Sequence, residues 1–178
     1  MSGIGYQAKP LSRANIRDFA MRVRGALGLA DRPYVNVELL IDFLMPKCFP
    51  GFSYDVWATA EMGNNHGLAR PDERFIILRE DVYERACAGK GRDRLTVVHE
   101  VAHLLLHTKD RILLRRGTGE PKRFCDPEWQ ANCFAGEFLV AHTMARQCGN
   151  PLEIERMFGV SPDAADFQWK RFKEDGLL

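Results

Sequence analysis

Residues 97–107 read VVHEVAHLLLH, and apolar side chains fill every position of this stretch except three histidines and one glutamate. Apolar residues would cover nearly the whole circumference of a helix from Arg94 to about His107, which predicts a central core helix. We expect Asp93 to cap this helix at its N-terminus. An unpaired charge or imidazole is costly to bury, so the polar side chains inside this helix need either partners or a metal ion.

His99 and His103 lie one helical turn apart and point in directions about 40° apart, so both imidazoles can bind one ion. Glu100 lies about 60° beyond His103, where its carboxylate can stand beside the ion without binding it. This H-E-x-x-H arrangement is typical of a zinc site whose glutamate acts as general base. The alternative is a pair of core histidines that backbone carbonyls satisfy, with Glu100 paired to one of them.

A catalytic zinc ion needs a third protein ligand and an open position for water. The sequence offers several candidates for that ligand: His66, His107, Cys125, Glu128 and His142. His107 continues the same helix and is awkwardly turned for a third contact, and Cys125 precedes the next helix. Glu128 falls in the first turn of that helix, where a carboxylate also favours the helix dipole for purely structural reasons.

Asn132 follows Glu128 by one helical turn and faces the same way. Metal-bound histidines usually donate their second N–H group to a nearby acceptor, and the amide oxygen of Asn132 could be that acceptor for His99. The alternative is a polar surface residue tolerated in a helix.

Composition limits the class of protein. The chain has 178 residues, 46% of them apolar, with a formal net charge of +1, so it can build a core and has no strong overall field for nucleic acid. Its five cysteines include no C-x-x-C pair, which favours reduced thiols over disulfides or a cysteine zinc site. Residues 1–30 hold no continuous apolar signal region, and no apolar run is long enough to span a membrane. We therefore expect a cytoplasmic protein.

Elsewhere the pattern predicts helices separated by a β-rich region. A helix should follow Ser12 and end near Gly28, and a second should follow Asn36 and stop at Pro46. Three strands are expected between residues 53 and 78, in the segments SYDVWA, GLAR and RFIIL. The remaining expectations are a short helix or extended segment at 79–86, loops at 46–51 and 89–93, and a basic loop at 108–125. Asp126 should cap a helix that begins with Pro127 and stops at Gly149. A helix–turn–helix is expected at 151–174, with Ser161 as the cap of its second helix.

Beyond these patterns, the stretch 97–107 and the later segment EWQANCFAGEFL (128–139) together resemble the ImmA/IrrE family of bacterial and phage metallopeptidases. That family combines H-E-x-x-H with E-x-x-A-N/D-x-F-A, and the second pattern is matched here from Glu128 to Ala135. The resemblance covers roughly residues 35–175. Where the family commonly reads leucine-leucine-methionine-proline, this chain has Phe138-Leu139-Val140-Ala141, a departure that affects helix termination but no ligand.

The resemblance implies that His99, His103 and Glu128 bind Zn²⁺ and that Glu100 is the catalytic base. It implies an α+β, minimal zincin-like fold: a small twisted mixed sheet packed on helices at residues 1–145, and a helical C-terminal extension at 146–178. The implied function is zinc-dependent cleavage of a partner protein, typically a helix-turn-helix repressor or antitoxin-like regulator encoded nearby in a mobile element or stress-response locus. The alternative is a zinc-containing component of a toxin–antitoxin or phage repressor system that binds its partner without cutting it.

Three further features of the reaction are open at this point. A second donor to the oxyanion is expected among Tyr54, Tyr83, His66, His107 and His142. The substrate could add as a strand to an exposed sheet edge, for which RFIIL (74–78) is the candidate, although it could equally be a core strand. The basic segment 109–123, with six basic and two acidic residues, could favour an acidic target or simply be solvated.

A DNA-binding module is the rival interpretation of the helix–turn–helix at 151–174. Residues 146–178 carry five basic and six acidic side chains, a net charge of −1. A helix that reads a DNA groove normally brings a basic face, so we do not expect direct nucleic-acid binding.

Overall fold

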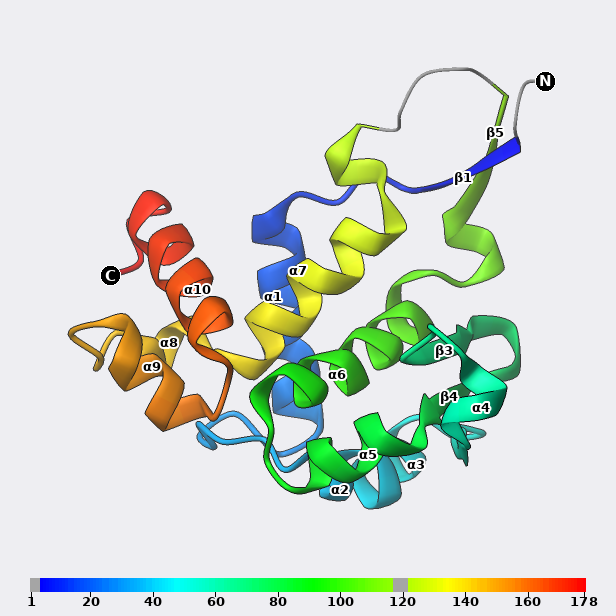
Figure 1. The fold of residues 1–178 in the computed structure, drawn as a ribbon. Helices are drawn as coiled ribbons and strands as arrows, with labels where there is room; N and C mark the ends of the chain where they lie inside the picture. Colours follow the sequence, from blue (N-terminus) through cyan, green and yellow to red (C-terminus); the bar gives the residue numbers. More distant parts are fainter. Residues whose placement is uncertain (1–3, 117–121) are drawn as a thin grey trace.

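The computed structural model describes residues 4–116 and 122–178, in which a small three-stranded sheet lies at one side of a group of helices (Figure 1). The strands β2 (Ser53–Trp57), β3 (Gly67–Arg70) and β4 (Phe75–Arg79) lie in the order β2-β4-β3. β4 runs parallel to β2 and antiparallel to β3, so the sheet is mixed. The predicted α+β class, with a small mixed sheet beside helices, is confirmed.

A second pairing joins distant parts of the chain. β1 (Ile4–Ala8) and β5 (Ile112–Arg116) form an antiparallel pair in which Ala8 lies opposite Ile112. The prediction of a loop throughout 108–125 is therefore wrong for β5. The partner strand of β5 lies about a hundred residues earlier, so nothing in the local sequence pointed to the pairing. Residues 117–121 of the predicted loop lie outside the described residues.

Except for α4, which lies in the region predicted as strands and turns, the helices follow the expected order along the chain. Their bounds are α1 (Arg13–Ala26), α2 (Val37–Leu39), α3 (Met45–Cys48), α4 (Thr59–Met62), α5 (Glu80–Cys87), α6 (Gly91–Leu106), α7 (Pro127–Leu139), α8 (His142–Ala145), α9 (Pro151–Phe158) and α10 (Pro162–Glu174). Short 3-10 turns lie at Pro71–Glu73, Lys109–Arg111 and Arg123–Cys125. The predicted N-caps Ser12, Asn36, Asp126 and Ser161 all accept a hydrogen bond from the backbone of the helix that follows.

Two predicted helix ends are wrong. The second helix does not stop at Pro46 but continues to Cys48, through a wider π-type turn at Leu40–Leu44 in which the Met45 N–H bonds back to the Leu40 carbonyl. Such a turn relieves the clash between a proline ring and the preceding carbonyls. α7 ends at Leu139 instead of continuing to Gly149, and the short α8 follows it.

The predicted cap of the central helix is also wrong. α6 begins at Gly91, with Lys90 in the capping position, so Asp93 lies inside the first turn. There its carboxylate accepts two hydrogen bonds from Arg85, at 2.9 and 3.0 Å, and joins α5 to α6. The helix therefore starts three residues earlier than the capping pattern indicated.

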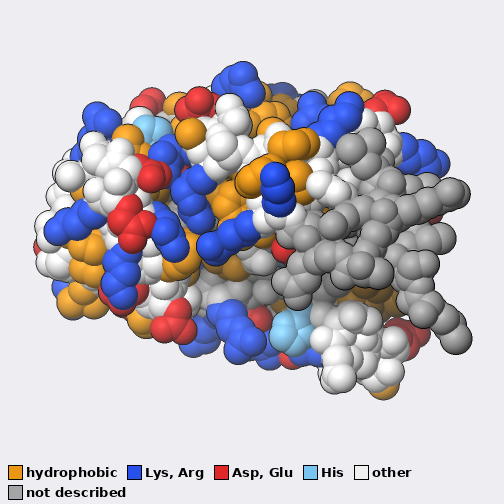
Figure 2. All heavy atoms as spheres, turned by 90° about the horizontal axis from the view of Figure 1, so that it is seen from above, with side chains coloured by type: hydrophobic (Ala, Val, Ile, Leu, Met, Phe, Trp, Pro, Cys, Tyr) orange, Lys and Arg blue, Asp and Glu red, His pale blue; other side chains and the backbone are white. Residues whose placement is uncertain are grey.

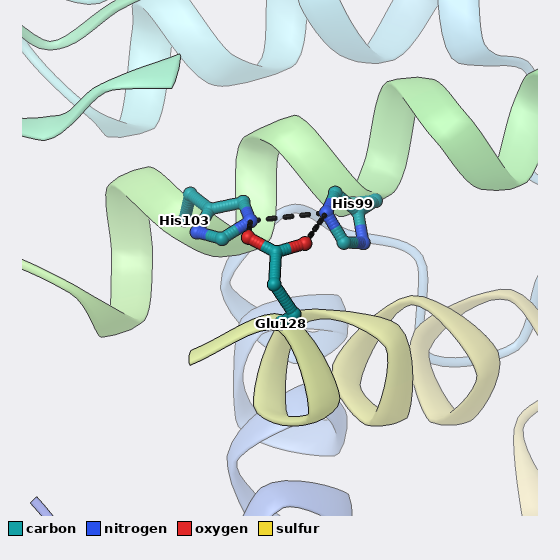
Figure 3. A group of neighbouring side chains, drawn as sticks. All are labelled: His99, His103 and Glu128. Atoms are coloured by element: carbon teal, nitrogen blue, oxygen red, sulfur yellow. Dashed lines mark hydrogen bonds and ion pairs between the residues drawn. The ribbon is translucent and has the colours of Figure 1, made fainter. Parts of the chain in front are cut away.

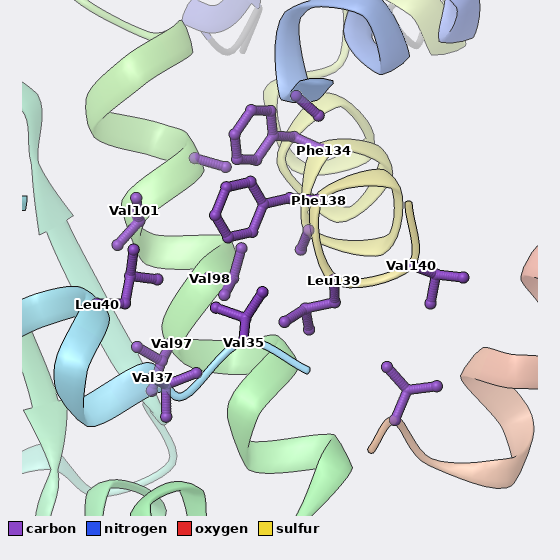
Figure 4. Close-up of a cluster of buried hydrophobic side chains, with 14 of the residues drawn as sticks. Val35, Val37, Leu40, Val97, Val98, Val101, Phe134, Phe138, Leu139 and Val140 are labelled. Carbon is purple, nitrogen blue, oxygen red and sulfur yellow. The ribbon is translucent and has the colours of Figure 1, made fainter. Parts of the chain in front are cut away.

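The core is built around α6, as its apolar circumference predicted. Figure 1 shows α6 in the middle of the molecule, with α7 on one side and α5 and the sheet on the others. In Figure 4 the α6 valines face the aromatic rings of α7 and the segment that leads into α2; the labelled residues are Val97, Val98, Val101, Phe134, Phe138, Leu139, Val140, Val35, Val37 and Leu40. Each such side chain contributes about 1.5–3 kcal/mol by its burial. This packing fixes α6 and α7 against each other.

The two C-terminal helices pack onto this core. Arg94 of α6 is fully buried and donates hydrogen bonds to the carbonyl of Phe158, at 2.9 Å, and to that of Val35, at 2.7 Å. Ile154 and Phe172 are also buried in the common core. We propose that residues 1–145 form one domain and that residues 146–178 are an extension packed on it. Across the described residues, no helix is both long and apolar enough to cross a membrane.

Candidate metal centre

Two imidazole rings project from the same face of α6. His99 and His103 lie one turn apart, their ring centroids are 4.7 Å apart, and their Nε2 atoms are separated by 3.0 Å. Both side chains are about 15% exposed, so the rings are largely but not completely shielded from solvent. The helix therefore presents two nitrogen donors to one point in space.

Glu128 of α7 reaches that point from the opposite side (Figure 3). Asp126 caps α7 by accepting from the Glu128 N–H, and Pro127 occupies the first turn, so the local sequence places Glu128 where the helix begins. Its Oε2 lies 3.2 Å from His99 Nε2, and its Oε1 lies 3.3 Å from His103 Nε2. One carboxylate thus spans both rings.

The three side chains have the geometry of a metal ligand set. One donor atom from each of His99, His103 and Glu128 can be chosen so that all lie within 4.8 Å of one another. Two ligands at the usual zinc bond lengths in a tetrahedral site would be about 3.3 Å apart. The observed separations of 3.0–3.3 Å match this spacing, so the residues fit a zinc ion.

Among the described residues, the other candidates for a third ligand do not join this cluster, although His66 lines the same cleft as His99. Cys125 is buried before α7 begins, and His142 packs its ring against Phe172 at 6.3 Å between centroids. His107 contacts Nδ1 of His103, whereas the other His103 nitrogen, Nε2, is the one that faces Glu128. Of the alternatives that the spacing left open, the geometry favours Glu128.

Glu100 lies beside the three donors but is not one of them. It is 7% exposed and lines the same cleft as His99, where it lies against β3 at Gly67. Burial raises the pKa of the Glu100 carboxyl, although the neighbouring histidines act in the opposite direction. A raised pKa makes the carboxylate a stronger proton acceptor.

The electrostatics of the centre agree with this arrangement. Hydrogen bonds from His103 and His99 hold the pKa of Glu128 far below its ordinary value, which keeps it an anionic ligand. Burial lowers the pKa of His99, but the Glu128 and Glu100 carboxylates outweigh that effect and raise it overall. A cation bound between these groups would experience the same carboxylate charges that raise the pKa of His99.

Each of the two histidines also has a hydrogen-bond partner at Nδ1, the ring nitrogen that does not face Glu128. Asn132 lies one turn beyond Glu128 on α7, and its Oδ1 accepts from His99 Nδ1 at 3.1 Å, so the prediction for Asn132 is confirmed. The Nδ1 atom of His103 lies 2.9 Å from Nδ1 of His107, whose Nε2 lies 3.1 Å from Oε1 of Gln130. Gln130 could not be predicted from the sequence, because a glutamine on a helix gives no signal of burial by itself.

A cleft of about 290 Å³ opens beside His99 and Glu100. Its lining includes Asn64, Asn65, His66, Gly67, Leu95, Thr96, His99, Glu100 and Asn132. Among the candidate oxyanion donors, only His66 belongs to this lining. Tyr54 donates to Asp42 at 2.6 Å and lies 3.5 Å from the Tyr83 hydroxyl, so those two phenols are engaged with each other and with Asp42.

The predicted substrate edge is wrong. β4, which contains most of RFIIL, is the middle strand of its sheet, and Ile76, Ile77 and Leu78 are fully buried. The core-strand alternative therefore holds. β3 lies at the edge of this sheet and packs against α6, next to Glu100.

Comparison with known protein families gives one match. The family model described as IrrE N-terminal-like domain, a peptidase family, matches residues 56–170. This range contains both α6 and α7 and therefore all three candidate ligands. No curated protein and no solved structure matches the chain.

Proposed function

The chain belongs to the peptidase family of IrrE N-terminal-like domains, and on that basis we propose that it is a zinc-dependent endopeptidase that cleaves a partner protein. The family supports a metallopeptidase-type activity. The observation that carries the finer proposal is the cluster of His99, His103 and Glu128 with the buried Glu100 beside it. Together they provide three ligands and a separate base, which is the set that metal-assisted amide hydrolysis needs.

When bound, the zinc ion supplies a Lewis acid that polarises the substrate carbonyl and lowers the pKa of a water molecule. His99 and His103 would hold it through Nε2 and Glu128 through a carboxylate oxygen. The carboxylate of Glu100 accepts a proton from the attacking water and returns it to the nitrogen of the leaving amine. Because Glu100 is buried, bulk water does not compete for the proton that its carboxyl carries between these two transfers.

Two further residues have proposed roles around the scissile bond. His66 lines the cleft and would donate an N–H to the oxyanion that develops on the carbonyl oxygen. The edge strand β3 would pair with an extended substrate segment, because it borders α6 at Glu100. Substrate backbone bound to β3 would then pass in front of the three ligands.

The proposed substrate is a helix-turn-helix repressor or antitoxin-like regulator encoded near this protein, as the family resemblance implies. A direct role in DNA binding has less support. In Figure 2, acidic, basic and apolar side chains are mixed over the left part of the visible face, the side on which Figure 1 shows the C-terminal helices, which is unlike a basic groove-reading surface. Ile154 and Phe158 of α9 and Phe172 of α10 are instead used for packing.

Incubation with the product of a neighbouring regulator gene tests the proposal. Intact-mass spectrometry should detect two fragments whose masses add up to that of the substrate plus one water. Chelator should prevent their formation, and added zinc should restore it. The matched control is Glu100→Gln, which keeps the three ligands and should bind zinc without cutting. Cleavage that persists in chelator or in Glu100→Gln would contradict the proposal, and zinc binding without cleavage of any neighbouring regulator would favour the non-cleaving alternative.

A further inference from the structure

The two candidate histidine ligands are supported in different ways. His99 Nδ1 meets an amide oxygen, which can only accept a hydrogen bond. His103 Nδ1 meets another imidazole nitrogen, that of His107, at 2.9 Å. An imidazole nitrogen can donate or accept, so this contact alone does not decide which ring carries the shared proton.

The orientation of Gln130 decides it. The Nε2 amide group of Gln130 donates to two backbone carbonyls, those of Lys9 and Phe124, both at 2.8 Å. Reversing the amide would place its oxygen against both carbonyl oxygens, which is repulsive. The Oε1 atom must therefore face His107, and it is an acceptor only.

The proton positions then follow in sequence. Gln130 Oε1 accepts from His107 Nε2 at 3.1 Å, so the proton of a neutral His107 is on Nε2 and its Nδ1 carries a lone pair. That lone pair accepts from His103, which places the His103 proton on Nδ1. In a neutral His103 the lone pair is therefore on Nε2, the atom that faces His99 and Glu128 and that a metal ion would use.

We propose that His107 and Gln130 are positioning residues, which hold His103 in the tautomer whose Nε2 lone pair points at the metal centre. Gln130 is fully buried and His107 is 5% exposed, so solvent does not compete for these hydrogen bonds. With both nitrogens engaged, His107 serves as neither a third ligand nor an oxyanion donor. The inference rests on the proposed function for its consequence, but the proton positions can be measured without metal or substrate.

The two backbone carbonyls that fix the Gln130 amide lie outside the H-E-x-x-H motif in the sequence. Lys9 lies between β1 and α1. Its N–H donates to the Arg111 carbonyl at 2.9 Å, next to the pairing of β1 with β5. Phe124 precedes α7 in the 3-10 turn at Arg123–Cys125. Residue 9 is outside the segment that the family model matches, so residues beyond the family domain help to orient a metal ligand.

Three variants of the full-length chain test the proposal through zinc affinity. His107→Phe keeps an aromatic ring but removes the acceptor, and it should weaken zinc binding about 10- to 100-fold. His107→Asn should bind within about threefold of wild type, because asparagine Oδ1 occupies the position of histidine Nδ1 and can accept from His103. His142→Phe is the matched control, since that histidine packs against Phe172, and it should bind zinc as wild type does.

A spectroscopic measurement reads the tautomers directly. Long-range ¹H–¹⁵N correlation spectra of the metal-free wild-type protein should show the His103 proton on Nδ1 and the His107 proton on Nε2. A neutral His103 with its proton on Nε2 instead of Nδ1, or wild-type zinc affinity in a folded His107→Phe variant, would overturn the proposal. If His107→Phe does not fold, the wild-type spectrum decides. Neither readout requires cleavage, so an inactive wild-type protein with these tautomers would count against the proposed function alone.

Discussion

A Cβ atom added at Gly67 would lie 2.6 Å from Cγ of Glu100. The glycine in β3 and the glutamate in α6 are therefore in a contact that no larger residue permits. The backbone of the edge strand forms one wall of the space that holds the proposed base.

This contact predicts the effect of Gly67→Ala. The added methyl group should displace the Glu100 carboxylate by about 1 Å, and such a displacement can lower the rate about 100-fold. Zinc content should stay at one ion per chain, because none of the three ligands is touched. Cleavage rates check the expected loss of activity, and elemental analysis of the same sample checks the zinc content. Gly25→Ala is the control, since a Cβ there meets no atom within 4 Å, and equal activity in the two variants would show that the contact is unimportant.

Removing the ligand from α7 should separate metal binding from folding. Glu128→Ala should reduce zinc to well below one ion per chain, because two imidazoles alone leave the ligand set incomplete. The side chain of Glu128 is 68% exposed, so the metal-free protein should keep its far-UV circular dichroism. Full zinc occupancy in Glu128→Ala would require a different third ligand.

The neutral state of His107 predicts a pH dependence of folding. Burial lowers the pKa of His107 to about 4 in the folded protein, while an unfolded imidazole titrates near 6.5. Between these values the unfolded chain binds more protons, so this residue makes the free energy of unfolding fall as the pH falls. From pH 7.5 to 4.5 the metal-free wild type should lose about 2–3 kcal/mol more than His107→Asn.

Urea denaturation of both metal-free proteins at the two pH values measures this difference. The comparison with His107→Asn is needed because His99, whose pKa is raised, contributes with the opposite sign. If both proteins lose the same free energy of unfolding between the two pH values, folding does not lower the pKa of His107, and this prediction is wrong.

A buried ion cluster should stabilise the helical framework. Glu137 of α7 is fully buried and accepts hydrogen bonds from Arg17, at 2.9 Å, and Arg13, at 3.2 Å, which tie α7 to α1. Glu137→Ala leaves Arg17 without its buried partner and should lower the free energy of unfolding by about 3–5 kcal/mol. The control is Glu73→Ala, which breaks an exposed pair with Arg70 and should cost at most about 1 kcal/mol. Similar losses in both variants by urea denaturation would contradict this role.

Sequence patterns predicted the parts of the fold that depend on local rules. The caps at Ser12, Asp126 and Ser161, the three central strands and the buried α6 all follow from residue type and periodicity. The grouping of His99 with His103 follows from helix geometry, and the approach of Glu128 was one of several possibilities until the packing of α7 on α6 was seen.

What the sequence did not predict depends on tertiary contacts. The pairing of β1 with β5 and the central place of β4 are decided by segments distant in the chain. Asp93 was expected as a cap, but the guanidinium of Arg85 offers its carboxylate a better partner. Gln130 and Gly67 have no local signature, because their importance lies in what a distant residue places against them.

The central claim is that one zinc ion is held between α6 and α7. An anomalous difference map at the zinc edge, from a crystal grown with zinc, tests it most directly. We expect a single strong peak about 2.0–2.2 Å from His99 Nε2, His103 Nε2 and a Glu128 oxygen. A map with no peak between these side chains, or with zinc bound only at other residues, would contradict the account.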